Sequence, residues 1–571
     1  MKKEILVVFK THLDIGFTDF ANNILQKYLN VYIPNAIRVG YELKDTDTPF
    51  VWTVGSLMIW YALKNDKSGT VEQAIRDGIL RWHALPCTTH TELMSPALFE
   101  YGVSLSKRLD ERFGTHTVGA KMSDVPGHTL GIVPILKRHG IEFLHLGVNP
   151  ATPVPEVPPI FHWKCGEDEI TVMYQGDYGE EIDLGNLLLS FAHTGDNLGP
   201  QNAEGVVEVY KQLREKYPDT PIRVGTIDDI AIALRDKDLP VIDKEIGDTW
   251  IHGLGTDPEK VSRFKKVQRA LNEWKDELPD LTDNLLCVPE HTWGLNMKRH
   301  FPYDGFYTHE DVLRMRDACA CPEKSWEEQR DYVRFAEALL GVTPDYPVQK
   351  PDTGSYIPME IPEDIGFEIS WQLFDASDYE CYKGEYMRSF AWWAIEDFTK
   401  VGLGSYRGGT YTAQVRQAFQ RGEEALYALS FKDSLKKAYG LPDFYLSVCG
   451  EEITVKWFGK LPSRLPQAFW FKIKGQKEDW EINKMGLWIS PDDIIGSPLI
   501  SGIDEGIRNS EVLIESLDCA LVAPYGRKLL RFGKHPKKQN LYFNLYNNIW
   551  NTNFPMWYSD DALFRFRIRK K

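Results

Sequence analysis

Two side chains able to bind a metal ion lie near the N-terminus, directly after a short apolar run. The run ILVVF at residues 5–9 predicts a strand, and the segment THLDIGFTD follows at residues 11–19. His12 and Asp14 are two positions apart, so both would project to the same side of an extended chain. Zinc accepts imidazole nitrogen and carboxylate oxygen as ligands. An ordinary His–Asp hydrogen bond also fits this spacing, so the pair alone leaves both interpretations open.

Three later stretches carry further candidates. Asp124 ends the predicted strand GAKMSD ahead of a Pro-Gly turn, where barrel enzymes keep catalytic groups, although an Asp there can also cap a helix. Asp196 lies in the loop TGDNLGP, whose glycines allow close approach of a ligand. Burial would make Asp196 a proton donor by raising its pKa, whereas an Asx turn is the structural alternative. His291, beside Glu290 in LLCVPEHTWG, is a candidate to complete a metal site.

Composition limits the class of protein. The chain has 571 residues, of which 43% are hydrophobic and 26% charged, which predicts a folded protein of two or three domains. The 66 Lys and Arg against 82 Asp and Glu give a formal charge of −16, so no nucleic-acid partner is expected. No run approaches about 20 apolar residues, so no membrane-spanning segment is expected. The opening MKKEILVVFK lacks the features of a secretory signal, and the eight cysteines form no CxxC pair, so the expected location is the cytoplasm.

The elements that must position these side chains follow three patterns along the chain. From residue 4 to about 235, short apolar runs alternate with amphipathic stretches such as 96–113 and 129–140, which predicts a parallel sheet covered by helices. Helical patterns dominate from 256 to 440, at 258–278, 325–341, 384–402 and 412–438, with a proline-rich loop at 342–364. After 441, short alternating runs predict strands.

We therefore expect three domains. The first, residues 1–255, is an α/β barrel-like catalytic domain with seven parallel strands. The second, residues 256–440, is a helical bundle, and the third, residues 441–571, is a β-sandwich. The oligomeric state stays open.

Together the motifs resemble those of the class II α-mannosidases of glycoside hydrolase family 38. THLDIGFTD is similar to the family's opening HxDxGW/F signature, and DVPGHT at 124–129 to its nucleophile motif. TGDNLGP is similar to the GDGGGGP loop of bacterial-type members. GDTWIHGLGTDP at 247–258 is similar to the segment containing HrGtyT, and LLCVPEHTWG stands where the family has a QFHD-type segment. The chain departs from the family in its shorter length and in the Thr-Trp pair that follows His291.

The resemblance implies roles for these residues. One Zn²⁺ per chain would be bound by His12, Asp14, Asp124 and His291. Asp124 would also be the nucleophile, with Asp196 as the acid/base. Rival proton donors are found in QGDYGEEID, namely Asp177, Glu180, Glu181 and Asp183.

Other side chains are candidates for the lining of a sugar pocket, with core packing or loop structure as the alternative for each. Those that could bind substrate are His252, Trp293, Asn548 and Trp550, and Tyr178 is a further candidate. His90 and Glu92 also fall at a predicted strand end.

The resemblance predicts a zinc-dependent retaining glycoside hydrolase, most simply an exo-acting α-mannosidase that forms a glycosyl-enzyme on Asp124. Retaining enzymes hold two carboxyl groups about 5–5.5 Å apart in different protonation states, which suits Asp124 and Asp196. The substrate would be an oligosaccharide or another glycoside. Two alternatives remain open: a metal-dependent carbohydrate deacetylase or amidohydrolase, and a non-catalytic carbohydrate-binding relative.

Overall fold

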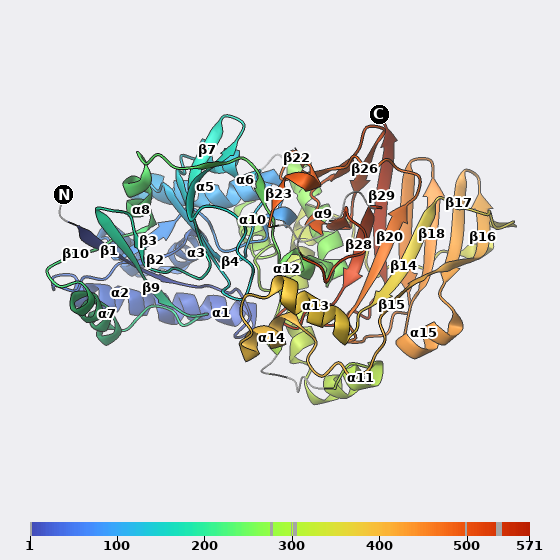
Figure 1. Ribbon diagram of the computed structural model, residues 1–571, viewed down its shortest axis with the longest axis horizontal. Coiled ribbons are helices and arrows are strands. Elements are labelled where there is room, and N and C mark those ends of the chain that lie inside the picture. Colours follow the sequence, from blue (N-terminus) through green and yellow to red (C-terminus); the bar gives the residue numbers. More distant parts are fainter. Residues whose placement is uncertain (1–2, 274–277, 298–299, 301–304, 497–499, 533–539) are drawn as a thin grey trace. The chain divides into compact units, whose positions relative to one another are not determined.

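The chain forms two compact units in the computed structural model, which describes residues 3–273, 278–297, 300, 305–496, 500–532 and 540–571 (Figure 1). The first unit comprises Met1–Thr91, Pro96–Lys244 and Pro289–Thr292. The second comprises Glu92–Ser95, Glu245–Val288 and Trp293–Lys571. His291 therefore belongs to the first unit, although nearly all of its sequence neighbours belong to the second.

Two sheets make up the framework of the first unit. One has the order β3-β2-β1-β9-β8, with β10 also paired to β1, and the other has the order β11-β6-β7-β5-β4. The strands of the first sheet are β1 (Glu4–Thr11), β2 (Trp52–Gly55), β3 (Leu80–His83), β8 (Ile182–Asp183), β9 (Leu187–Thr194) and β10 (Ile222–Val224). Those of the second are β4 (Gly119–Asp124), β5 (Phe143–Val148), β6 (Ile160–Cys165), β7 (Asp168–Gln175) and β11 (Val241–Ile242).

Most strand pairs of this unit are parallel, as the alternating pattern predicts. β1 pairs in parallel with β2, β9 and β10, and β4 with β5. The exceptions are β8 with β9 and β6 with β7, which are antiparallel. The β6–β7 pair has a tight turn at Gly166, where φ is +62°, and the sequence patterns did not predict β6.

A closed seven-stranded barrel is not confirmed. In the described residues the strand ladders form two separate sheets, and the edge strands β3 and β4 approach each other through a bond from the Ala84 amide to the Gly119 carbonyl, 2.9 Å long. The first unit is thus a mixed, mainly parallel α/β region.

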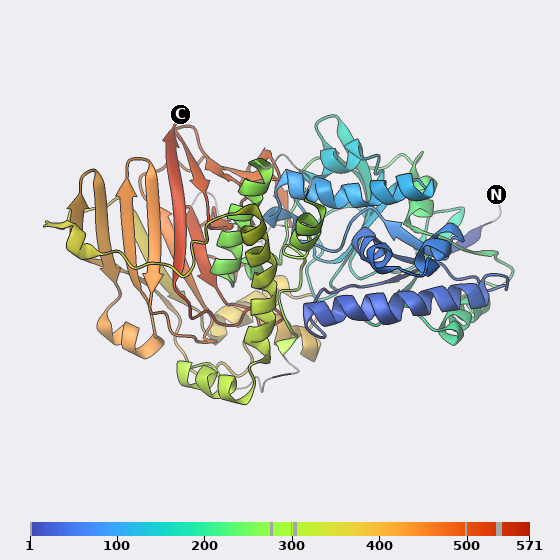
Figure 2. The same ribbon diagram turned by 180° about the vertical axis from the view of Figure 1, so that it is seen from behind.

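Helices flank these sheets (Figure 2). Apolar side chains of β1, β2 and β3 pack against α1, α2, α3 and α7 in one buried cluster. The predicted amphipathic stretch 96–113 coincides with α5. The helices of this unit are α1 (Ala21–Lys27), α2 (Ile33–Leu43), α3 (Ser56–Asn65), α4 (Thr70–Arg76), α5 (Pro96–Phe113), α6 (Ile132–Arg138), α7 (Ala203–Lys216) and α8 (Ile227–Leu234).

The second unit begins with helices and continues into antiparallel sheets. Its helices are α9 (Pro258–Glu273), α10 (Pro279–Leu285), α11 (His309–Ala318), α12 (Cys321–Leu340), α13 (Ala376–Tyr386), α14 (Trp392–Phe398) and α15 (Asp433–Tyr439). The predicted helices at 258–278 and 325–341 correspond to α9 and α12, with residues 274–277 outside the described part. The helical middle of the chain is therefore confirmed.

Two large sheets and a small strand pair complete the second unit. The ten-stranded sheet consists, in spatial order, of β13 (Ile357–Met359), β16 (Gln414–Arg421), β17 (Glu424–Ser430), β18 (Asp443–Cys449), β19 (Glu452–Phe458), β29 (Ala562–Lys570), β26 (Val512–Ser516), β25 (Gly506–Arg508), β21 (Glu481–Lys484) and β22 (Leu487–Ile489). The six-stranded sheet consists of β15 (Gly409–Thr412), β14 (Phe367–Leu373), β20 (Gln467–Ile473), β28 (Tyr542–Asn547), β27 (Leu521–Ala523) and β24 (Ser501–Gly502). The small pair is β12 (Glu245–Ile246) with β23 (Ile494–Ile495).

The predicted helix at 412–438 is wrong. This segment forms the hairpin β16–β17 followed by α15, and its turn lies at Gly422, where φ is +59°. Gln, Arg, Glu and Ala favour helices, but pairing of β16 with β13 and of β17 with β18 outweighs that local preference. Likewise, the predicted helix at 384–402 is broken into the end of α13 and the short α14.

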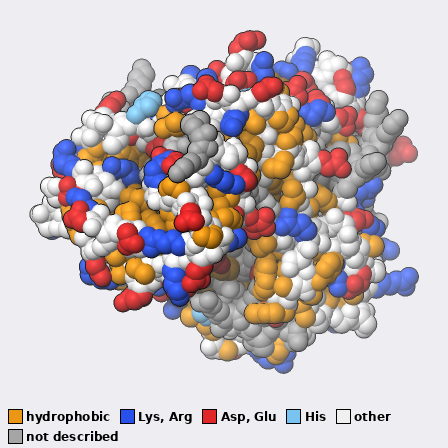
Figure 3. Space-filling view, turned by 60° about the vertical axis from the view of Figure 1, so that its left-hand side comes forward, with side chains coloured by type: hydrophobic (Ala, Val, Ile, Leu, Met, Phe, Trp, Pro, Cys, Tyr) orange, Lys and Arg blue, Asp and Glu red, His pale blue; other side chains and the backbone are white. Residues whose placement is uncertain are grey.

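The surface carries both signs of charge. On the face drawn in Figure 3, acidic and basic side chains are interspersed, and no broad field of Lys and Arg covers the described part of that face. Among the described residues, no helix is long and apolar enough to cross a membrane.

Candidate metal centre and active site

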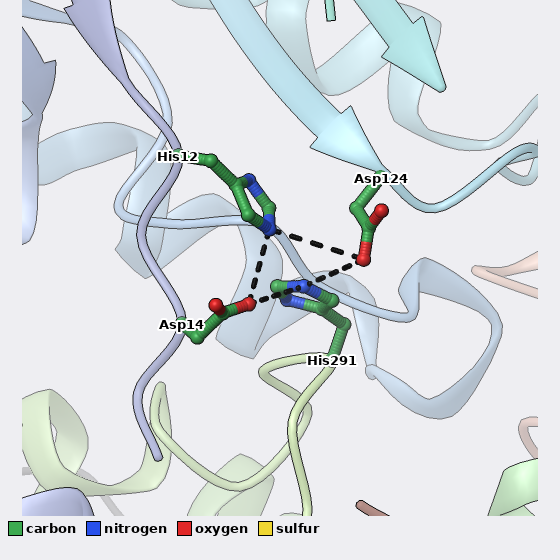
Figure 4. Close-up of side chains that lie close together, drawn as sticks. All are labelled: His12, Asp14, Asp124 and His291. Carbon is green, nitrogen blue, oxygen red and sulfur yellow. Dashed lines mark ion pairs between the residues drawn. The ribbon is translucent and has the colours of Figure 1, made fainter. Parts of the chain in front are cut away.

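Four side chains from three separate parts of the sequence converge in the first unit. His12, Asp14, Asp124 and His291 are all buried, and one ligand atom from each lies within 4.8 Å of the others. Figure 4 shows the four side chains pointing toward one another. Asp14 Oδ1 lies 3.0 Å from His12 Nε2 and 3.1 Å from His291 Nε2. Asp124 Oδ2 lies 3.8 Å and 3.3 Å from the same two nitrogens.

The ends of two strands and one loop position this cluster. His12 and Asp14 follow directly on β1, and Asp124 is the last residue of β4 (Figure 4). Asp124 has φ of +84°, a backbone conformation that costs a side-chain-bearing residue about 1–3 kcal/mol and is concentrated at functional sites. His291 is held by its amide, which donates to the Thr88 carbonyl.

The electrostatics of the cluster favour ionised carboxylates. Burial acts to raise the pKa of Asp14, but the His12 and His291 rings outweigh burial and hold that pKa well below its ordinary value. The pKa of Asp124 is also lowered, because hydrogen bonding to His291 and the charge of His12 outweigh burial. Burial acts to lower the pKa of His291, yet Glu290 and the two aspartates raise it well above the ordinary value. A metal cation bound among these side chains would stabilise the charged carboxylates in place of the protons on the two imidazole rings.

The donor set and its spacing fit zinc. A tetrahedral zinc site with bonds of about 2.0–2.1 Å has corners about 3.3–3.4 Å apart. The four measured separations between imidazole nitrogen and carboxylate oxygen run from 3.0 to 3.8 Å. Two imidazoles and two carboxylates, all buried, are therefore able to hold a metal ion, and this donor set suits zinc among several divalent metals.

Each histidine has a partner on the ring nitrogen that faces away from the cluster. His12 Nδ1 lies 2.8 Å from Ser123 Oγ, and His291 Nδ1 lies 2.6 Å from Glu290 Oε1. Glu290 is fully buried, and its Oε2 accepts bonds from the Thr292 amide and hydroxyl at 3.0 and 2.5 Å. Such partners keep a proton on Nδ1, which makes Nε2 the nitrogen that would bind a metal ion.

The second oxygen of Asp124 is held from another direction. Asp124 Oδ1 accepts a bond of 3.0 Å from the Asn149 amide and a bond from the Tyr178 hydroxyl. Burial, followed by the charge of Asp124, raises the pKa of Tyr178 well above its ordinary value, so the phenol stays protonated and donates. One carboxylate oxygen thus faces the metal cluster while the other is oriented by two hydrogen bonds.

Asp196 lies in a loop that is fastened to the metal-binding segment. Its neighbour Asn197 donates its amide N–H to the His12 carbonyl at 3.2 Å, and Asn197 Oδ1 accepts the Asp14 amide at 3.1 Å. Asn197 Nδ2 also donates to the Asp14 carbonyl at 3.0 Å. Burial, then the charge of Asp14, raises the pKa of Asp196 to about 6. Asp196 therefore holds its proton to a higher pH than Asp124 does.

The rival proton donors have other partners. Asp177 Oδ1 accepts the Gly179 amide at 2.8 Å in a local turn. Glu181 pairs with Lys216 at 2.6 Å, and Asp183 pairs with Lys3 at 2.5 Å, both on the surface. The backbone carbonyl of Glu180 accepts a bond from the Gln175 side chain, a contact that does not involve the Glu180 carboxyl group.

The four proposed substrate-binding residues are buried in the second unit. His252 packs against Trp550 with ring centroids 5.3 Å apart, and burial lowers the pKa of His252 to about 4. Trp293 lies under the Lys260 ammonium, 3.7 Å from the ring centroid. The Asn548 amide donates to the Ser463 and Met556 carbonyls, so it has a structural part in its loop. A role in substrate binding stays a prediction for all four residues.

The remaining candidates, His90 and Glu92, have structural surroundings. The buried His90 donates its amide to the Pro289 carbonyl and thereby fastens the loop that carries His291. In the second unit, Glu92 pairs with the buried Lys484 at 2.8 Å, and burial raises the pKa of Glu92 to about 7.

Sequence reasoning missed several contributors to the site, namely Asn149, Ser123, Asn197 and the contact of Glu290 with His291. Asn149 follows β5 directly, so its place at a strand end next to β4 was a usable signal. The position of Glu290 directly before His291 was another.

Comparison with solved structures shows a shared fold. An alpha-mannosidase from Enterococcus faecalis V583 matches with a TM-score of 0.60 and 9% identity, over 100% of this chain and 87% of that one. A protein in glycosyl hydrolase family 38 from Enterococcus faecalis matches with a TM-score of 0.56 and 9% identity, over 100% of this chain and 86% of that one. The resemblance to this family is thus confirmed at the level of the fold.

Sequence comparisons add little. A family model described as a domain of unknown function, DUF5054, matches residues 254–349. The search of curated proteins gave no match.

Glu290→Gln should weaken zinc binding about 10- to 100-fold, because an amide orients and polarises His291 less well than a carboxylate. Competition with a chromogenic chelator measures this affinity without any assay of turnover. Glu100→Gln, which alters an exposed carboxylate paired with Arg138, is the matched control and should bind zinc like the unaltered protein. Equal affinity of Glu290→Gln and the unaltered protein would show that Glu290 does not support the metal centre.

Proposed function

We propose that this chain is a zinc-dependent retaining glycoside hydrolase, and specifically an exo-acting α-mannosidase on oligosaccharides. The observation that carries the proposal is a pair of aspartates whose pKa values are shifted in opposite directions. The pKa of Asp124 is lowered because its histidine neighbours outweigh burial, whereas burial raises the pKa of Asp196 to about 6. Retaining glycosidases require such a pair. The fold shared with an alpha-mannosidase and a family 38 protein supports the choice of reaction class.

His12, Asp14, Asp124 and His291 would hold the zinc ion. When bound, zinc would neutralise charge at the cluster and offer a Lewis-acidic anchor for sugar hydroxyls. Asp124 Oδ2 faces the other ligands, which makes Oδ1 the nucleophilic oxygen. Asn149 and Tyr178 hold Oδ1 in place before the attack and stabilise its charge when it later leaves.

The reaction proceeds in two displacements. In the first, Asp124 Oδ1 forms a bond to the anomeric carbon while the glycosidic carbon–oxygen bond breaks, and Asp196 gives its proton to the departing oxygen. In the second, Asp196 removes a proton from water, whose oxygen attacks the anomeric carbon and releases Asp124. The sugar leaves with its anomeric configuration retained, and Asp196 is protonated again.

Hydrolysis of a panel of aryl α- and β-glycosides, before and after chelation and zinc addition, tests the proposed class. We expect the α-mannoside to be cleaved, chelation to abolish cleavage and zinc to restore it. Zinc-dependent cleavage of another α-glycoside would show that the substrate sugar is not mannose and would leave the proposed mechanism unchanged. Absence of turnover on every glycoside by zinc-loaded protein would contradict the proposal and favour a deacetylase or a binding protein.

The pH dependence of kcat/KM should follow the ionisation of Asp196. Because a general acid must be protonated, kcat/KM should fall as pH rises above about 6, the pKa of Asp196 in the free protein. Asp196→Asn should remove this alkaline limb and lower kcat/KM about 10²- to 10⁴-fold for substrates with poor leaving groups. The loss of kcat/KM should be smaller for aryl glycosides with good leaving groups, since their departing oxygen needs little protonation.

Asp177→Asn is the matched control, because it makes the same Asp-to-Asn change at one of the rival carboxylates. It should keep the alkaline limb. Loss of that limb in Asp177→Asn, with the limb intact in Asp196→Asn, would assign the proton donor to Asp177 instead.

A further inference from the structure

Two buried lysines, Lys10 and Lys121, lie on the strands β1 and β4 that lead to the candidate metal cluster. Lys10 lies in β1, two residues before His12, and Lys121 lies in β4, two residues before Ser123. Residues two apart in a strand share a face, so both lysines point into the same interior as the cluster. Lys10 is 0% exposed and Lys121 is 6% exposed.

Neither ammonium forms an ion pair with a carboxylate in the part of the chain that the structure describes. Lys121 Nζ donates to Ser123 Oγ at 3.0 Å and to the Thr11 carbonyl at 3.3 Å, which uses two of its three N–H groups. Lys10 Nζ donates to the Tyr178 carbonyl and lies 3.5 Å from His193 Nδ1. Burial and then the charge of Lys121 lower the pKa of Lys10 well below its ordinary value, against the opposing charge of Asp177. Lys121 has no comparable acidic neighbour, and burial lowers its pKa to about 8.

The surrounding imidazoles cannot compensate this charge. His83, His145 and His193 lie near the two lysines, and the pKa of each is lowered by burial and then by the lysine charges. All three rings are therefore neutral near pH 7. A buried ammonium without a partner is costly, so the interior lacks one negative charge beside Lys121.

A small cavity is lined in part by Lys121. It encloses about 20 Å³, somewhat more than one water molecule needs, and its polar lining includes Lys121, His83, Thr11 and Thr88. The Nδ1 atom of His83 is buried and has no hydrogen-bond partner among the described residues. Thr88 Oγ1 accepts the Ser123 amide at 3.2 Å, which leaves the hydroxyl proton free to donate. Several donors are therefore available around a space for a single small ion.

We propose that this cavity is a halide site, occupied by one chloride ion paired with the Lys121 ammonium and hydrogen-bonded by Thr88 and His83. Water would fit but would leave the buried ammonium without a counter-charge. The site is distinct from the metal cluster, and it is linked to the cluster through Lys121, Ser123 and His12 Nδ1. The proposal does not depend on the glycosidase activity.

Anomalous diffraction from crystals of the zinc-loaded protein in sodium bromide tests the site directly. We expect a bromide peak in the cavity, next to Lys121 Nζ. The Lys121→Met variant should lose this peak, and Lys137→Met, which changes an exposed lysine of the same unit, should keep it. Peaks confined to the protein surface would mean an adventitious ion only and would overturn the proposal.

Thermal unfolding in sodium chloride and in sodium gluconate at equal ionic strength gives a solution test. Chloride should raise the Tm of the unaltered protein saturably, by about 2 °C or more at saturation, because it binds only the folded state. Lys137→Met should respond in the same way, and Lys121→Met should not respond. Identical melting curves of the unaltered protein in the two salts would overturn the proposal even if Lys121→Met does not fold.

Discussion

The first unit depends on keeping two buried carboxylates, Asp14 and Asp124, ionised side by side. Such a pair repels itself and is costly to bury, and it persists because both groups contact the same two imidazoles at 3.0–3.8 Å. The arrangement is suited to a divalent cation, whose charge balances the two carboxylates more fully than shared protons do. The hydrogen bonds around the cluster hold its four side chains, His12, Asp14, Asp124 and His291, in place.

The holding contacts come from several elements at the carboxyl ends of strands. Asn197 fastens the loop after β9 to the segment after β1, which brings Asp196 close to the candidate metal ligands. Asn149, following β5, and Tyr178, following β7, hold the outer oxygen of Asp124. Burial opposes ionisation of both aspartates. At Asp124 the His12 and His291 rings outweigh burial and lower the pKa, whereas Asp196 lacks such neighbours at hydrogen-bond distance in the described residues and burial raises its pKa to about 6. Environment alone thus shifts the pKa values of two aspartates in opposite directions.

The sequence predicted individual elements better than their assembly. β4 and α5 were predicted with their bounds, since apolar runs and amphipathic periodicity are local signals. The β6 strand, the two-sheet arrangement in place of a confirmed barrel, and the β16–β17 hairpin depend on pairing between distant segments, which no local pattern records. The four metal-binding candidates were predicted from motifs and lie together, whereas the contacts of Asn149, Ser123 and Glu290 became visible only in three dimensions.

The central claim is that Asp124 forms a covalent bond to the sugar. Incubation of the zinc-loaded protein with 5-fluoro-α-mannosyl fluoride, followed by mass spectrometry of the intact protein and its peptides, tests it most directly. The account predicts one added glycosyl unit on the peptide that contains Asp124. The adduct should be absent in Asp124→Gly, a variant whose glycine suits the φ of +84° at this position. An adduct on another carboxylate, with Asp124 unmodified, would contradict the account.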